Sequence, residues 1–142
     1  MIGLLVTIFL GNFNSEATVR ALRFEEARRG ALEQLLYLSK EQLATAQNPK
    51  VTDAVVGVAL NPKIPFEERV MAVRALVPVG DGQRVRALSK LLASSDSPEG
   101  IALARETAKT LFKLGAMPVL AEGLGHGDPE VRQWAARAGM DG

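Results

Sequence analysis

The side chains that could do chemistry in this sequence are few and poorly grouped. His126 is the single histidine, in the glycine-flanked stretch GLGHGDPE, where Asp128 and Glu130 are the next carboxylates along the chain. One imidazole with two carboxylates is a weak pattern for a metal ion, since zinc sites in proteins use three or four such ligands in defined geometry. We therefore expect His126 to be a turn residue at the end of a helix and expect no metal site.

Patterns for acid–base, nucleophilic or phosphate chemistry are also missing. The adjacent carboxylates Glu25-Glu26 and Glu67-Glu68 would point in different directions on a helix, so they are poor catalytic pairs. The chain has no cysteine, no glycine-rich phosphate loop after a strand and no serine in a nucleophile elbow. We predict that the protein is not an enzyme and uses no cofactor.

The composition indicates one domain of closely packed helices. Of the 142 residues, 47% are hydrophobic and only 5% are aromatic, so the core must be built from Leu, Val, Ala and Ile. The net charge of +1 gives no overall field that would attract nucleic acid or an anionic membrane. A basic binding surface would therefore have to be local.

Residues 1–14 form an apolar N-terminal segment that differs from the rest of the chain. Its stretch MIGLLVTIFLGNF carries no charge, is shorter than the roughly 20 residues of a spanning helix, and lacks the features of a secretory signal. Two interpretations remain open: a strand or short helix buried in the domain, or an exposed segment that docks on a partner chain, an apolar groove or a membrane interface. The candidate contact residues are Ile2, Leu4, Leu5, Ile8, Phe9 and Phe13.

The remaining residues, 15–142, predict a single all-helical domain. Ser15 is expected to be the N-cap of the first helix, and residues 15–47 form either a helical hairpin or one long helix, with Gly30 at the break or inside it. Asn48-Pro49 predicts a helix start and Asn61-Pro62 a helix end. Five more helices are expected, at residues 65 to 76–80, 82–94, 101–115, 117–126 and 129–139.

A repeated pattern links several of these helices. Arg69, Ala72, Arg74 and Ala75 are spaced along the chain in the same way as Arg132, Ala135, Arg137 and Ala138. The stretch ARETAKTLFKLG fits between them when Ala104 replaces the leading arginine, and Lys109 then aligns with Arg74 and Arg137. The steps between positions 69, 104 and 132 are 35 and 28 residues, near the roughly 30 to 47 of two-helix repeats. Small residues at these positions let neighbouring helices approach closely.

The stretch GDPEVRQWAARAG resembles the HEAT-like repeat, in particular the type first noted in phycobilin lyases, where an Asp-Pro-x-Val-Arg turn leads into an alanine-rich second helix. The resemblance covers roughly residues 51–142 and implies that residues 48–142 form a short right-handed α-solenoid of helical hairpins. It also implies a structural ladder in which Asp128 and Arg132 connect successive repeats, although the other repeats lack the aspartate. The family mostly has roles in protein–protein contact and assembly.

The function that these features favour is a non-catalytic scaffold or adaptor. It would bind another protein, or copies of itself, through the helical-repeat surface and the apolar N-terminus, and we expect it in the cytoplasm, with membrane contact only through residues 1–13. One alternative is a nucleic-acid-associated module that uses a basic row formed by Arg74, Lys109 and Arg137. Another, suggested only by the family name, is an enzyme or lyase subunit. Trp134 is expected to be buried; if exposed, it would be a contact residue.

Overall fold

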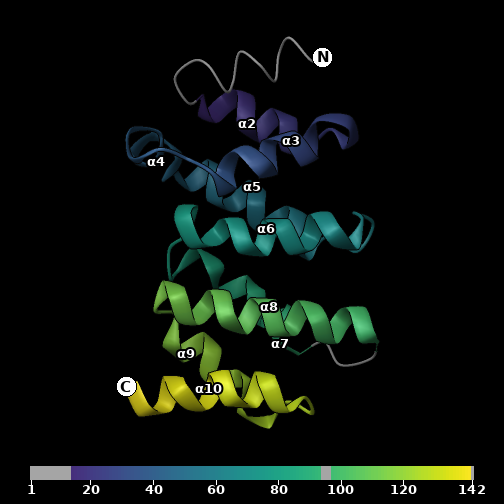
Figure 1. The fold of residues 1–142 in the computed structure, drawn as a ribbon, viewed down its shortest axis with the longest axis vertical. Coiled ribbons are helices and arrows are strands. Elements are labelled where there is room, and N and C mark those ends of the chain that lie inside the picture. Colours follow the sequence, from purple (N-terminus) through teal and green to yellow (C-terminus); the bar gives the residue numbers. More distant parts are fainter. Residues whose placement is uncertain (1–13, 94–96, 142) are drawn as a thin grey trace.

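The computed structural model of this protein describes residues 14–93 and 97–141. Every regular element in these two ranges is a helix (Figure 1), in agreement with the all-α fold predicted from the sequence. The elements are α2 (Ser15–Leu22), α3 (Glu25–Leu36), α4 (Lys40–Ala46), α5 (Pro49–Leu60), α6 (Phe66–Val79), η1 (Arg84–Leu88), α7 (Ser89–Leu92), α8 (Pro98–Leu114), α9 (Met117–Leu120), η2 (Ala121–Gly125) and α10 (Pro129–Asp141).

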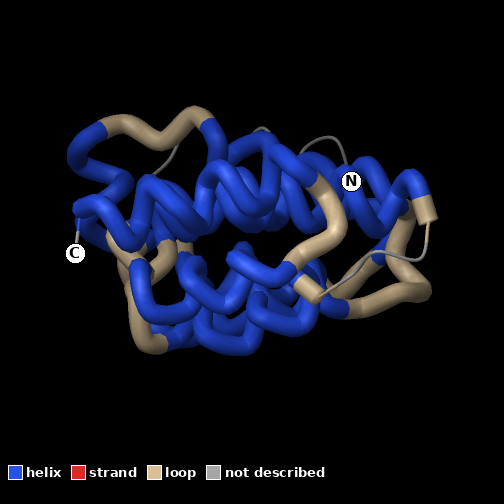
Figure 2. Tube along the Cα trace, turned by 90° about the horizontal axis from the view of Figure 1, so that it is seen from below, coloured by secondary structure: helices blue, strands red, loops and turns tan. Residues whose placement is uncertain are grey.

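The helices are arranged in two layers, which Figure 2 shows in a view along the stack. Layer B consists of α3, α6, α8 and α10, each of which packs against the next. Layer A consists of α2 and α5, followed by η1 with α7 and by α9 with η2. Each layer A segment precedes and contacts one layer B helix, so the chain forms four consecutive hairpins. The short helix α4 lies between the first two hairpins and contacts α6.

Side-chain caps define where several helices begin. Asn48 Oδ1 accepts a hydrogen bond from the backbone N–H of Lys50, and Ser97 Oγ accepts one from Gly100 N–H. Proline follows each cap at the first helical position, where the missing N–H costs nothing. Ser39 and Gln42 form a reciprocal capping box that starts α4. The helix start predicted from Asn48-Pro49 and the end predicted at Asn61-Pro62 are therefore correct, whereas α8 begins at Pro98 and not at residue 101 as expected.

The first hairpin corrects one expectation from the sequence and decides another point that the sequence left open. The N-cap of α2 is Asn14, whose Oδ1 accepts from Ala17 N–H, and not Ser15. Gly30 lies inside α3, whereas the chain turns at Arg23 and Phe24. The turn at this place lets α2 and α3 pack against each other, and Leu22 and Leu32 are both buried in the common core.

The layer A segments of the last two hairpins are shorter and less regular than predicted. Residues 82–94 were expected to form one helix, but the structure has the 3₁₀ helix η1 followed by α7; likewise, residues 117–126 form α9 and then the 3₁₀ helix η2. Gly123 explains part of this compact geometry, since an added Cβ there would lie 3.1 Å from Val131 Cγ1. The absence of a side chain at Gly123 thus lets η2 approach α10 closely.

Small side chains occupy one equivalent position in every layer B helix. Ala31, Ala72, Thr107 and Ala135 are all almost fully buried, and three of them follow the repeat steps read from the sequence. Leu35, Leu76 and Leu111, four residues further on, are fully buried as well. The alternation of a small and a large side chain on each helix fills the space between layers at the density typical of protein interiors.

A second repeated feature is an arginine that closes three of the four hairpins; the third hairpin has Ala104 at the equivalent position. Arg132 Nη1 donates to the carbonyls of His126 and Gly127 at 2.7 and 2.8 Å. Arg28 Nε donates to Leu22 O at 2.9 Å and Arg69 Nε donates to Ala59 O at 3.0 Å. The arginine therefore satisfies carbonyls at the end of the preceding layer A segment. Arg28 precedes Arg69 by 41 residues and extends this pattern to the first hairpin, which the alignment of positions 69, 104 and 132 did not include.

The close approach at the small position gives a first prediction. Ala135→Leu should lower the free energy of unfolding by about 1–3 kcal/mol, because the larger side chain has no room beside Gly123. The neighbouring substitution Ala136→Leu is the matched control, since Ala136 is exposed on the same helix and should change stability by less than about 0.5 kcal/mol. Urea denaturation followed by circular dichroism measures both; equal effects would contradict the packing argument.

The arginine pattern gives a second prediction. Arg132→Ala removes the donor for two turn carbonyls and should destabilise the fold by about 1 kcal/mol. Arg86→Ala provides the control, because Arg86 is exposed in η1 and makes no ion pair with the described residues. Thermal unfolding of both variants decides the matter: an unchanged Tm in Arg132→Ala would show that this arginine has no structural role.

Candidate functional site

The three members of the basic row predicted from the sequence lie on successive helices of layer B. Arg74 is on α6, Lys109 on α8 and Arg137 on α10. Arg74 and Lys109 line one hollow of about 300 Å³, and Lys109 and Arg137 line a second one of about 310 Å³. The two hollows meet at Glu106 and Lys109 of α8, so the row crosses one continuous surface, which we call the B face.

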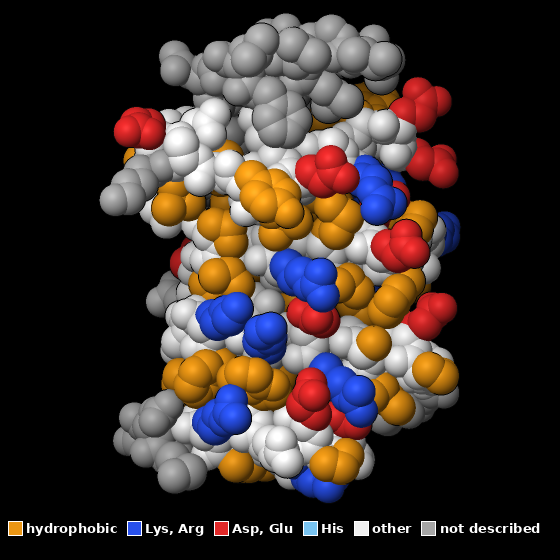
Figure 3. All heavy atoms as spheres, viewed as in Figure 1, with side chains coloured by type: hydrophobic (Ala, Val, Ile, Leu, Met, Phe, Trp, Pro, Cys, Tyr) orange, Lys and Arg blue, Asp and Glu red, His pale blue; other side chains and the backbone are white. Residues whose placement is uncertain are grey.

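The first hollow, between α6 and α8, combines apolar and cationic side chains. Leu36, Val77 and Pro78 supply apolar surface, and Val77 is one of the exposed large hydrophobic residues. Lys113, one turn beyond Lys109, adds another cation to its wall. Figure 3 shows Lys and Arg side chains gathered at the middle of this face, over α6 and α8.

The second hollow, between α8 and α10, is built around Trp134. The indole packs against Phe112, with ring centroids 5.3 Å apart, and the guanidinium carbon of Arg137 lies 4.4 Å from the indole centroid. Trp134 is half-buried, which differs from the buried position expected from the sequence. Its inner edge joins the core, while its outer edge and the stacked Arg137 remain part of the surface.

Charge on the B face is only partly neutralised. Arg74 donates to both carboxylate oxygens of Glu106, at 2.9 and 3.3 Å. This hydrogen bonding holds the pKa of Glu106 below its usual value; the nearby charges of Arg74, Lys109 and Lys113 act in the same direction, and burial opposes them. Among the described side chains, no carboxylate lies within 4 Å of a Lys109, Lys113 or Arg137 nitrogen. These cations are available to a ligand.

The row changes sign at its N-terminal end. Glu33 of α3 occupies the position equivalent to Arg74, five residues after the arginine that closes the hairpin. Glu33 is half-exposed and lies 3.5 Å from Arg29 in an i,i+4 pair. From α3 to α10 the equivalent positions are therefore one acidic residue followed by three basic ones.

Other charged residues of layer B connect neighbouring helices. Arg28 of α3 pairs with Glu68 of α6 at 3.2 Å, and Arg29 lies 3.7 Å from Glu67, so both adjacent carboxylates take part in ion pairs. Arg105 of α8 donates to both oxygens of Asp128, at 2.7 and 3.0 Å. Together with Arg74 and Glu106, these pairs place at least one ion pair at every junction between consecutive layer B hairpins.

The turn before α10 explains the role of Asp128. Its Oδ2 accepts hydrogen bonds from Glu130 N–H and Val131 N–H, which makes it the cap of α10, while it also binds Arg105 of the preceding hairpin. Asp128 therefore connects successive hairpins through Arg105, next to Ala104. Among the described residues, the side chain of Arg132 donates to carbonyls of its own hairpin.

His126 takes part in the same turn. Its Nδ1 accepts a hydrogen bond from Asp128 N–H at 2.9 Å, and the side chain is buried. In residues 14–93 and 97–141, no three His, Cys, Asp or Glu side chains are grouped so that they could hold a metal ion. The histidine therefore lies where a turn residue was expected.

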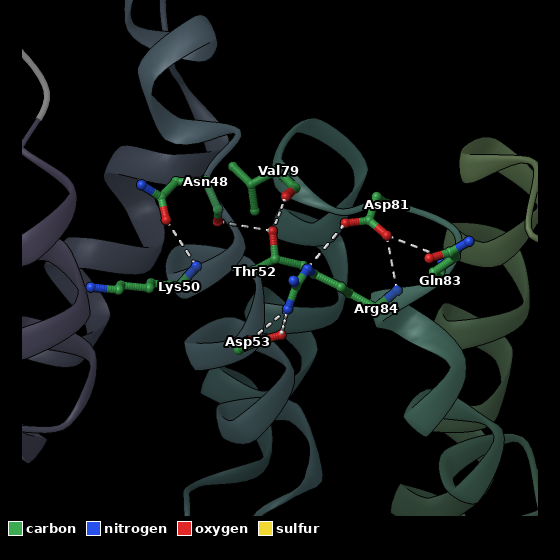
Figure 4. A network of polar contacts seen from close by, with 8 residues as sticks. All are labelled: Asn48, Lys50, Thr52, Asp53, Val79, Asp81, Gln83 and Arg84. Carbon is green, nitrogen blue, oxygen red and sulfur yellow. Dashed lines mark hydrogen bonds and ion pairs between the residues drawn. The ribbon is translucent and has the colours of Figure 1, made fainter.

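A further crevice lies between α2 and α5, apart from the two hollows of the B face, and the sequence did not predict it. It measures about 740 Å³, with an apolar floor that includes Val19 and Val58 and with Arg23 and Lys50 at its rim. Asp53 also lines it, but both its oxygens accept from Arg84 (Figure 4), so this carboxylate is already bound. The only signal in the sequence is Gly57, a glycine in a valine-rich helix where an added Cβ would meet open space.

Comparison of the chain with protein-family models, with curated proteins and with solved structures found no match in any of the three. None of the helices in the described part of the chain has the length and apolar character needed to cross a membrane. The candidate contact residues Ile2, Leu4, Leu5, Ile8, Phe9 and Phe13 lie outside the described residues. The candidate site therefore consists of the B face.

The Asp128 turn gives a prediction of pH dependence. The hydrogen bonds from Arg105, assisted by those from Val131 N–H and Glu130 N–H, lower the pKa of Asp128 from 3.8 to about 2 despite burial. Because the folded pKa lies below the unfolded one, the ionised carboxylate stabilises the fold above about pH 4, and this contribution is lost as the pH falls toward 2. Asp128→Asn keeps a capping oxygen but removes the ion pair.

We expect Asp128→Asn to lower the Tm by a few degrees at neutral pH, with a difference from the wild type that shrinks as the pH falls from about 5 to 2. Glu122→Gln is the control, since Glu122 is exposed in η2 and makes no ion pair with the described residues. A difference in Tm that stays constant over this pH range would mean that the ion pair is not what stabilises the turn.

Proposed function

We propose that this chain is a non-catalytic scaffold or adaptor of the HEAT-like type, a short right-handed α-solenoid that binds another protein, or a second copy of itself, through its B face. In this proposal the four stacked hairpins form one right-handed α-solenoid, and the protein acts in the cytoplasm. Residues 1–13 remain a second contact element on the basis of their apolar sequence.

The observation that carries the proposal is the group of uncompensated cations beside Trp134. Elsewhere in layer B, arginines are committed to structure, through ion pairs such as Arg28 with Glu68 or through carbonyl bonds such as those of Arg132. Lys109, Lys113 and Arg137 make no such ion pair or carbonyl bond. Lys109 and Lys113 border the hollow with apolar walls, and Arg137 stacks on Trp134 in the other hollow. A half-buried aromatic with adjacent free cations is the composition typical of a protein-binding hot spot.

The geometry of the surface also favours binding without a conformational change. The B face is formed by packed helices, and its ion pairs and small-residue contacts hold α6, α8 and α10 in position before any partner arrives. Side chains on such a scaffold lose little freedom on binding, so more of the contact free energy appears as affinity. A scaffold that acts by shape and charge needs this rigidity.

Nucleic acid is the less favoured partner for the same surface. Glu106 and Glu130 lie among the cations of the two hollows, and Glu33 reverses the sign of the row. Phosphate-driven binding depends on several Lys or Arg contacts along a strongly basic face, and these carboxylates interrupt it. Trp134 offers one partly exposed ring, where a single strand would need several for base stacking.

A site-directed cross-linking experiment tests the proposal. A photoreactive residue replaces Gln133, which lines the second hollow, and in a matched variant it replaces Gln83, an exposed glutamine of layer A. Each protein is irradiated in lysate of the source organism, once after nuclease treatment and once without it. We expect a discrete protein adduct at position 133, absent at position 83 and lost when Lys109→Glu is added, because charge reversal weakens docking.

Two outcomes would contradict the proposal. Equal adducts at positions 133 and 83 would show that the B face is not a specific surface. Adducts that form only in lysate with intact nucleic acid would transfer the function to nucleic-acid association. Sedimentation of the purified chain separates a second copy from a different partner.

A further inference from the structure

The crevice between α2 and α5 has room for a small ligand. Its volume of about 740 Å³ is more than twice that of either hollow on the B face and falls in the range of small-molecule sites in proteins. Gly57 keeps the crevice open on the α5 side, because a Cβ added there would meet no atom within 4 Å. The floor consists of aliphatic side chains: Val19 and Leu22 of α2, Ala54 and Val58 of α5, and Ile64 of the loop that follows.

Two of the charged side chains that line the crevice are available to an anion. Asp53 is already bound by Arg84, and Arg28 by a glutamate of α6. Arg23 and Lys50 are both exposed, and neither makes an ion pair with another described residue. Figure 4 shows Lys50 extending away from Asp53. The charge that the crevice offers to a ligand is therefore positive.

These two cations lie at one end of the crevice. Arg23 and Lys50 also line an adjoining hollow of about 390 Å³, which runs along α2 from Ser15, so they lie where the two spaces meet. Arg20 adds a further exposed cation to this adjoining hollow. Lys50 belongs to the first turn of α5, at the positive end of the helix dipole. The crevice thus has a cationic end at the start of α5 and an apolar floor that continues to Ile64.

From this arrangement we propose that the crevice binds a free carboxylic acid with an unbranched alkyl chain. The alkyl chain lies on the aliphatic floor. The carboxylate lies between Arg23 and Lys50, where guanidinium and ammonium donors can bond both of its oxygens. Because the crevice is in layer A, this small-molecule site is independent of the B face and of the function proposed for it.

The walls of the crevice favour an alkyl chain over a peptide. Both walls are helices, whose backbone N–H and C=O groups are bonded within each helix. A peptide in the crevice would leave its own backbone groups without partners, whereas an alkyl chain has no such groups. The described lining also holds no aromatic side chain, so a planar aromatic ligand would find no ring on which to stack.

Calorimetric titration of the full chain tests the proposal. The probe is dodecanoate, used below the concentration at which it forms micelles. Octanoate tests the need for a long chain, and dodecyltrimethylammonium, which has the same chain and the opposite charge, tests the need for an anion. We expect saturable binding of dodecanoate. Octanoate should bind at least about tenfold more weakly, because fewer methylene groups are buried, and the cationic amphiphile should not bind measurably.

Two substitutions locate the ligand. Gly57→Leu fills the floor and should weaken dodecanoate binding about tenfold or more, while leucine favours the helix. Its matched control is Gly82→Leu, because Gly82 also faces open space but lies outside the crevice. Lys50→Glu should weaken binding about fivefold or more, since an attraction becomes a repulsion. Arg86→Glu, in η1, is the control for charge reversal and should change the affinity by less than about twofold.

Three results would overturn the proposal. Absence of saturable dodecanoate binding to the full chain would show that the crevice takes no such ligand, whether residues 1–13 or a partner covers it. Binding that is equal in wild type, Gly57→Leu and Lys50→Glu would place the ligand elsewhere. Sedimentation with phosphatidylcholine vesicles that contain the carboxylate, without binding of the monomeric acid, would assign the crevice to a membrane surface. The cross-link at position 133 does not depend on any of these results.

Discussion

The close contact between successive layer B helices is the constraint on which the rest of the structure depends. It requires a small side chain at one position of each helix, occupied by Ala31, Ala72, Thr107 and Ala135, all of which are almost fully buried. Large leucines one turn later then fill the remaining space. Because the helices are held at this distance, equivalent exposed positions of consecutive helices fall into rows, and a row of side chains can act as one surface.

The same packing divides the charged residues into two groups with different roles. Some arginines bind a carboxylate or a carbonyl at a helix junction or a turn. Arg105, for example, binds the Asp128 that caps the next helix. Others, such as Lys109 and Arg137, are exposed on the middle of a helix and make no ion pair with the described residues. The first group stabilises the stack, and the second is what remains for recognition.

Much of the helical framework could be predicted because its signals are local. Asn48-Pro49 and Asn61-Pro62 mark the limits of α5, and the spacing around Arg69 and Arg132 indicated a repeated second helix. The errors occurred where contacts distant in sequence decide the result. The sequence left open whether a break falls at Gly30, and the chain turns at Arg23 and Phe24, beside the buried Leu22. The irregular η2, where one helix was expected, is consistent with its close packing on α10.

The sequence alone determined the helical class, the position of most helix ends and the alignment of Arg74, Lys109 and Arg137, because caps, prolines and the helical period act within a few residues of themselves. Only the tertiary structure decided which of these cations are free. Ion pairs such as Arg105 with Asp128 join residues 23 positions apart, and Arg74 meets Glu106 across 32. Such pairings depend on which helices become neighbours, which is set by packing of the whole chain and not by local pattern.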